Sequence, residues 1–194
     1  FNFWGPNANI KSTQWIADAS IYVDEKYDPT LNLIYLPHLD YCLQKFGVDL
    51  PAIAKELKEI DQVLEQLITH FESKNAEIIL LSEYGINDVN TPIHLNRILR
   101  EAGKIAIREE QGLELLDPGA SRAFAVSDHQ IAHIYCPDQT VIEAVKMLLM
   151  QTKGVAKVLS GDELAAYHID HPRSGDLVLI ADTDAWFTYY YWLD

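Results

Sequence analysis

The stretch that decides the fold reads LNLIYL, from Leu31 to Leu36, and it stops at Pro37. A second apolar run of strand length, AEIILL, spans Ala76 to Leu81, and a third, LVLIA, spans Leu177 to Ala181. Near-continuous apolar runs of this length are typical of parallel strands that are buried on both faces. We therefore expect all three runs to lie inside a sheet.

Helical patterns separate these runs. Apolar side chains recur every three or four positions from Asn7 to Tyr27 and from Pro51 to Ser73. Shorter helices are predicted from Pro92 to Arg100 and from Pro137 to Met150. Because strands alternate with helices, the sequence predicts an α/β fold with a mostly parallel sheet flanked by helices.

The same pattern predicts a partial α/β domain over residues 1–194, with a small α+β subdomain around residues 120–160. A hairpin is expected between Lys104 and Leu116. The sequence opens on the apolar Phe1 and closes just after the aromatic run Trp186–Trp192. Native termini are usually polar, so we expect a segment of a longer protein, with the aromatic run as core or as an interface with the rest.

Composition excludes several functions. There are 15 Lys and Arg against 29 Asp and Glu, which gives a formal net charge of −14. Such an acidic chain has no basic surplus for duplex nucleic acid or an anionic membrane. No apolar run reaches the roughly 18 residues of a membrane span. Cys42 and Cys136 are too few for a disulfide framework, and we expect reduced thiols in a cytoplasmic protein.

Carboxylates follow the first two apolar runs within a few residues. Asp40 comes after Leu31–Leu36, and Glu83 comes after Ala76–Leu81. In open α/β sheets, ligands bind beyond the carboxyl ends of the strands. Two carboxylates at one sheet edge can bind a divalent cation, so Asp40 and Glu83 are candidate metal ligands.

Histidines offer a second candidate. His129 and His133 are four residues apart. On a strand that spacing is about 13 Å, which is too long for one ion. The segment is either a polar turn entering a strand or a source of replacement metal ligands, with Asp128 and His129 as donors.

Three segments, taken in order, resemble a known family. LPHLD (residues 36–40), followed by Gln44 and Gly47, resembles the metal-ligand segment of the type I phosphodiesterase and nucleotide pyrophosphatase family, within the alkaline phosphatase superfamily. SEYGI (residues 82–86) resembles that family's Ser-Asp-His-Gly-Met turn. Residues 173–182 are similar to the late strand that precedes its last histidine ligand.

The resemblance implies a hydrolase of phosphate mono- or diesters that uses two divalent metals, zinc or manganese. Asp40 would hold one metal, and Glu83 would hold the other or bridge the pair. Asp40, Glu83, Tyr84 and His129 together are the predicted metal ligands. The resemblance places the nucleophile before Phe1, so the isolated chain is expected to be inactive on its small phosphate-ester substrate.

Departures from the family pattern leave alternatives open. Gln44 stands where the family has histidine, and Glu83-Tyr84 stands where it has Asp-His. Because Gln and Tyr are unusual zinc ligands, a degenerate binding or scaffold domain is the first alternative. A self-sufficient acidic α/β domain that binds a small molecule is the second.

Several polar residues have two interpretations each. His38 could orient Asp40 or simply end the strand. Arg173 could clamp an anion or pair with a nearby aspartate. Asn96, Arg97 and Arg100 are expected on a helix surface as salt-bridge partners.

Overall fold

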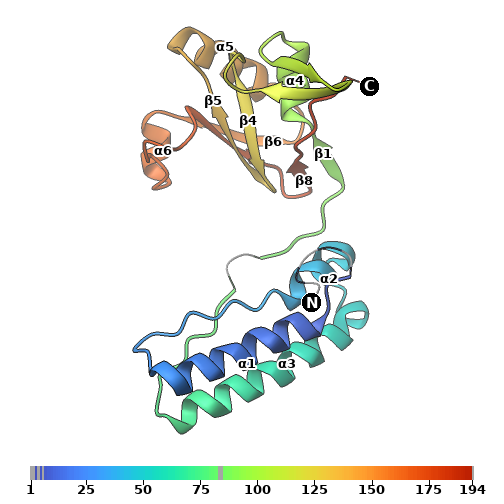
Figure 1. The fold of residues 1–194 in the computed structure, drawn as a ribbon. Coiled ribbons are helices and arrows are strands. Elements are labelled where there is room, and N and C mark those ends of the chain that lie inside the picture. The colour runs from blue at the N-terminus through green and yellow to red at the C-terminus, as the bar shows by residue number, and fades with distance from the viewer. Residues whose placement is uncertain (1–2, 4, 6, 83–84, 194) are drawn as a thin grey trace. The chain divides into compact units, whose positions relative to one another are not determined.

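The computed structural model describes residues 3, 5, 7–82 and 85–193. The chain divides into two compact units, Phe1–Asp88 and Val89–Asp194. Helices dominate the first unit, and all the described strands lie in the second (Figure 1). The helices and strands together make a mixed α/β chain, as the sequence predicted.

Helices of the first unit are α1 (Ile10–Tyr27), α2 (His38–Phe46) and α3 (Leu50–Ser73). The side chain of Asn9 caps α1 by accepting a hydrogen bond from the Lys11 backbone N–H at 3.1 Å. Asp28 ends that helix in the left-handed conformation, with φ 46°. The α1–α3 pair encloses a small core of Ala17, Val63, Leu67 and Phe71.

Residues 31–36 and 76–81, predicted as buried strands, belong to no β-ladder among the described residues. Both run as extended traces (Figure 1). Ile34 and Leu36 pack on the α1–α3 core, but Leu31, Leu33 and the residues from Ile78 to Leu81 are exposed. Within the first unit the expectation that these segments are buried is therefore wrong, because none of the described helices of this unit covers their outer side.

The second unit contains three small sheets. Its strands are β1 (Thr91–Ile93), β2 (Ala106–Glu110), β3 (Leu113–Asp117), β4 (Phe124–Asp128), β5 (Ile131–Tyr135), β6 (Val155–Ser160), β7 (Leu177–Ala181) and β8 (Ala185–Phe187). The pairs β1–β8 and β2–β3 stand apart from a sheet of order β4-β5-β7-β6. Only β1–β8 is parallel among the described strands, and the four-stranded sheet is antiparallel throughout. The prediction of a mostly parallel sheet is therefore wrong for the described strands.

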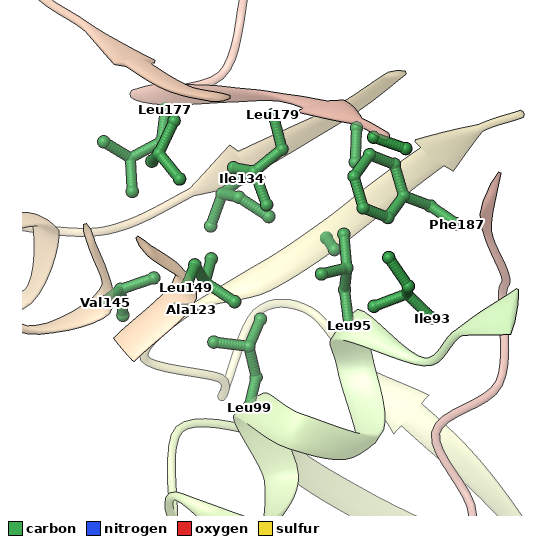
Figure 2. Packing of buried hydrophobic residues seen from close by; sticks show 14 of the residues in the cluster. Ile93, Leu95, Leu99, Ala123, Ile134, Val145, Leu149, Leu177, Leu179 and Phe187 are labelled. Carbon is green, nitrogen blue, oxygen red and sulfur yellow. The ribbon is translucent and has the colours of Figure 1, made fainter. Parts of the chain in front are cut away.

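Helices α4 (Leu95–Glu101), α5 (Gln139–Met150) and α6 (Asp162–Ala166) complete the second unit. Figure 2 shows its main core, where Leu95 and Leu99 of α4 face Ile134, Leu179 and Phe187 from the strands. Leu164 of α6 packs with Leu159 and Val178 in a separate cluster. In the described part of the chain, no helix has the length and apolarity needed to span a membrane.

Candidate functional site

Asp40 lies in the first turn of α2, directly after the extended segment 31–36. Its backbone N–H donates to the Pro37 carbonyl at 3.1 Å, which begins the helix. The partial positive charge at a helix N-terminus favours a carboxylate in this turn. The structure therefore keeps Asp40 at the end of the apolar segment, where the sequence placed it, and puts it in the first turn of a helix.

His38 precedes Asp40 by two residues and is directed toward α3. Its side chain is only 5% exposed, and its Nε2 lies 3.3 Å from Glu59 Oε2, in a contact that lacks hydrogen-bond geometry. Burial lowers the pKa of His38, and the charge of Glu59 opposes that shift. Because Nε2 faces Glu59, this nitrogen links α2 to α3.

Cys42, one turn after His38, is a buried free thiol. Its Sγ lies 3.1 Å from the Leu39 carbonyl oxygen, as a weak donor. Burial is the main cause that raises the pKa of this thiol, with the charge of Glu56 adding to it. A raised pKa suppresses the reactive thiolate, so Cys42 is a packing residue and not a nucleophile.

Glu83 and Tyr84, two of the four predicted metal ligands, lie outside the described residues. They follow the exposed segment 76–81 directly in the sequence. Their assignment as ligands stays a prediction.

His129 belongs to the second unit, at the turn between β4 and β5. It takes the left-handed conformation with φ 54°, and its carbonyl accepts a hydrogen bond from the Phe187 N–H at 2.7 Å. Its side chain is 79% exposed, with Nε2 3.7 Å from Asp128 Oδ1. His133 points elsewhere, since its Nδ1 accepts from the Gly175 N–H at 3.0 Å.

A metal ion in a zinc-type site usually needs three or four protein ligands. No group of three His, Cys, Asp or Glu side chains within residues 7–82 and 85–193 is placed to hold one. Asp40 is a suitable oxygen donor but cannot hold a cation alone. The described residues therefore do not fit a complete metal site, and no catalytic step through a metal is derived.

Residues 168–176, which carry Arg173, are held against the end of β5. The Arg173 carbonyl accepts from the Tyr135 hydroxyl at 3.0 Å, and Asp176 Oδ2 accepts from the Cys136 N–H at 2.7 Å. A Cβ on Gly175 would lie 2.7 Å from backbone atoms of Ile134, which explains the glycine there. The backbone contacts of this loop are thus structural.

The structure also forms a charge cluster that the sequence analysis missed. Asp24 Oδ2 of α1 accepts hydrogen bonds from His70 Nε2 at 2.8 Å and Lys74 Nζ at 2.7 Å, both on the α3 side. Its other oxygen accepts from the Asn32 amide at 3.2 Å. The bond from Lys74, then that from His70, holds the pKa of Asp24 below its usual value. The feature of the sequence that could have indicated this cluster is the i, i+4 spacing of His70 and Lys74, which places both on one side of α3.

Asp24 is the buried centre of this cluster, and the four side chains satisfy one another. The cluster joins the beginning of the apolar segment, through Asn32, to both long helices. We interpret it as a structural tie that positions the segment leading to Asp40.

Comparison with known proteins identifies the family. The chain matches the family described as "Type I phosphodiesterase / nucleotide pyrophosphatase" over residues 1–194. The chain therefore belongs to this family, as the motifs predicted. No curated protein matches the sequence significantly.

Solved structures agree on the fold. Phosphonoacetate hydrolase from Sinorhizobium meliloti 1021, in complex with phosphonoacetate, matches with a TM-score of 0.60 and 17% identity, over 94% of this chain and 44% of that one. Murine ectonucleotide pyrophosphatase/phosphodiesterase 5, in an inactive form with AMP, matches with a TM-score of 0.65 and 17% identity, over 98% and 47%. The chain thus spans less than half the length of these two proteins, which belong to the alkaline phosphatase superfamily.

Proposed function

We propose that the intact protein is a metal-dependent hydrolase of phosphate mono- or diesters, and that residues 1–194 carry only part of its active site. The observation that carries this proposal is the family match over the whole chain, residues 1–194. The ligands in the two solved structures, phosphonoacetate and AMP, support a small substrate with a phosphorus-containing group.

Asp40 and Glu83 are the proposed carboxylate ligands from this chain, with Tyr84 and His129 as further predicted ligands. What supports the role of Asp40 is that its carboxylate lies in the first turn of α2, directly after the apolar segment 31–36, which is the position that the resemblance gives to a metal ligand. Bound zinc or manganese would supply Lewis-acid stabilisation of the phosphate oxygens. The remaining ligands and the nucleophile are proposed to lie in the rest of the protein.

A scaffold role is the alternative. It is favoured by Gln44 and Tyr84, which replace strong metal-ligand types in the family pattern. In that case the protein keeps the family fold and binds a partner or ligand without hydrolysis.

Turnover of an aryl phosphodiester by the intact protein separates the two. We expect bis(p-nitrophenyl) phosphate to be hydrolysed, the activity to be lost after EDTA treatment, and zinc or manganese to restore it. Absence of turnover by a folded protein, with no zinc, manganese or iron found by elemental analysis, would favour the scaffold.

We also propose a cytoplasmic location. Its support is the cysteine content, since two cysteines in 194 residues are too few for the disulfide framework typical of small exported proteins.

A further inference from the structure

Two buried polar side-chain atoms of the first unit have no hydrogen-bond partner among the described residues 3, 5, 7–82 and 85–193. They are Oγ1 of Thr13, on α1, and Nε2 of His38, the first residue of α2. Thr13 is fully buried, and the His38 side chain is 5% exposed. A buried polar atom without a partner costs free energy, and native proteins almost always supply one. A partner that serves both atoms would remove this cost.

Thr13 and His38 line the same small cavity, whose other walls come from the segment before α1 and from Tyr41 of α2. The centre of a water-sized sphere can occupy about 10 Å³ of this cavity. That is close to the space that a single water molecule requires, and it is too small for a phosphate or an organic ligand. All of the walls belong to the first unit, so the cavity does not depend on where the second unit lies.

Tyr41 and Ser12 offer further polar contacts in this cavity. The Tyr41 hydroxyl accepts a hydrogen bond from the Gly5 N–H, and it can donate its own proton. The Ser12 hydroxyl donates to the Asn9 carbonyl at 2.9 Å, and its oxygen can accept. Buried waters usually make two to four hydrogen bonds, a number that these groups can provide together with Thr13 and His38.

Water is the occupant that fits these groups chemically. It can donate to Nε2 of His38 when this nitrogen is unprotonated and accept from it when it is protonated. An anion is disfavoured, because a carboxylate oxygen of Glu59 lies 3.3 Å from Nε2. A metal ion is disfavoured as well, since the part of the chain that the structure describes contains no group of three His, Cys, Asp or Glu side chains placed to hold one.

We propose that one buried water molecule binds in this cavity and hydrogen bonds to both Thr13 Oγ1 and His38 Nε2. The water joins α1 to the beginning of α2, two residues before Asp40, and so helps to fix the turn that carries Asp40. This water site does not rest on the proposed hydrolysis, because a scaffold with the same fold would contain the same buried atoms.

A high-resolution crystal structure of the intact protein tests the proposal. We expect density for one ordered water within about 2.6–3.2 Å of both atoms. Thr13→Val, which replaces the hydroxyl by a methyl group, should lose this water, while Thr69→Val, at an exposed position on α3, should retain it. The proposal is overturned by a direct hydrogen bond from His38 to Thr13 or Glu59, by water that contacts only one of the two atoms, or by no ordered water there.

A mutant cycle in solution measures the same link independently. Thr13→Val and His38→Phe should each lower the urea midpoint of the intact protein. The double variant should lower it by clearly less than the sum, because either substitution alone already breaks the water-mediated contact. Thr69→Val combined with His38→Phe should give additive effects. Additive effects in both pairs would contradict the proposal, and if His38→Phe does not fold, the wild-type crystal structure decides.

Discussion

Asn96 of α4 and Ala125 of β4 exchange two hydrogen bonds, one from the Asn96 amide to the Ala125 carbonyl at 2.8 Å and one from the Ala125 N–H to Asn96 Oδ1 at 2.7 Å. Asn96 is buried, contrary to its prediction as a helix-surface residue. Because β4 is an edge strand, the amide takes the place of a neighbouring strand.

Replacing Asn96 by Ala should therefore destabilise the second unit by about 2–4 kcal/mol, since a buried N–H and a buried carbonyl lose their partners. Asn96→Asp should also destabilise it, because a carboxylate cannot donate to the Ala125 carbonyl. Urea unfolding of the intact protein measures both. Arg97→Ala is the control, because its i, i+4 contact with Glu101 at 3.6 Å and its position 5.9 Å from the centre of the Tyr190 ring are weak interactions at the helix surface. Equal effects of the Asn96 and Arg97 variants would refute the explanation.

Phe187, within the C-terminal aromatic run, is almost fully buried in the main core (Figure 2). Phe187→Ala should cost about 3–5 kcal/mol of unfolding free energy, as is usual for a buried ring. Tyr189→Ala, at an exposed position of the same run, should cost less than about 1 kcal/mol. Denaturant titration of both variants tests whether Phe187 belongs to the core. Similar losses of unfolding free energy in the two variants would argue against it.

His38 makes stability depend on pH. Its pKa is lowered in the folded protein, mainly by burial, so the unfolded chain binds the proton more readily. The stabilisation is complete above the unfolded pKa of about 6.5 and declines as the pH falls below it. His38→Phe should flatten the change in urea midpoint between pH 7.5 and pH 5.5, while His129→Gln, at an exposed position, should retain it. A wild-type slope in His38→Phe would contradict this assignment.

Cys136 should react slowly with alkylating reagents. Burial, helped by the charges of Asp176 and Asp138, raises the pKa of its thiol to about 11. At pH 8 the thiolate fraction is then roughly a hundredfold below that of an ordinary cysteine. Iodoacetamide labelling followed by mass spectrometry should show slow modification in the native protein and fast modification in urea. Equally fast labelling in both states would show that the thiol is not protected.

The helices were predictable because their signals are local. The apolar patterns predicted the ends of α1 and α3 to within a few residues, and the predicted hairpin is confirmed as β2–β3. The N-cap is harder to assign from the sequence, because Asn9 makes the capping bond while Ser12, also a residue type common at N-caps, is buried inside the helix. Local sequence places a helix well, but several polar residues compete for its end.

Strand pairing was less predictable. Leu177–Ala181 is apolar throughout because β7 is central in its sheet, with Leu177 and Leu179 in the α5-containing core and Val178 against α6. A continuous apolar run thus indicates that both faces of the strand are buried. It does not indicate that the neighbouring strands are parallel. The partners of a strand are set by tertiary structure that the run itself does not encode.

For the candidate site, the sequence predicted the chemical type of the ligand group but not the element of structure that carries it. The Asp40 carboxylate follows the apolar segment as expected, whereas its place on α2 was not foreseen, because a helix beginning at His38 has no side-chain cap to signal it. The contact of His38 with Glu59 joins residues 21 positions apart, which spacing rules do not reach.

The most direct measurement of the central claim is metal content together with phosphodiester turnover in the intact protein carrying Asp40→Asn. The account predicts that this variant loses bound metal and that turnover falls by roughly a hundredfold or more, while its unfolding midpoint stays close to that of wild type. Asp61→Asn, at an exposed carboxylate on α3, should match wild type in both. Full metal content and unchanged turnover in Asp40→Asn would contradict the account.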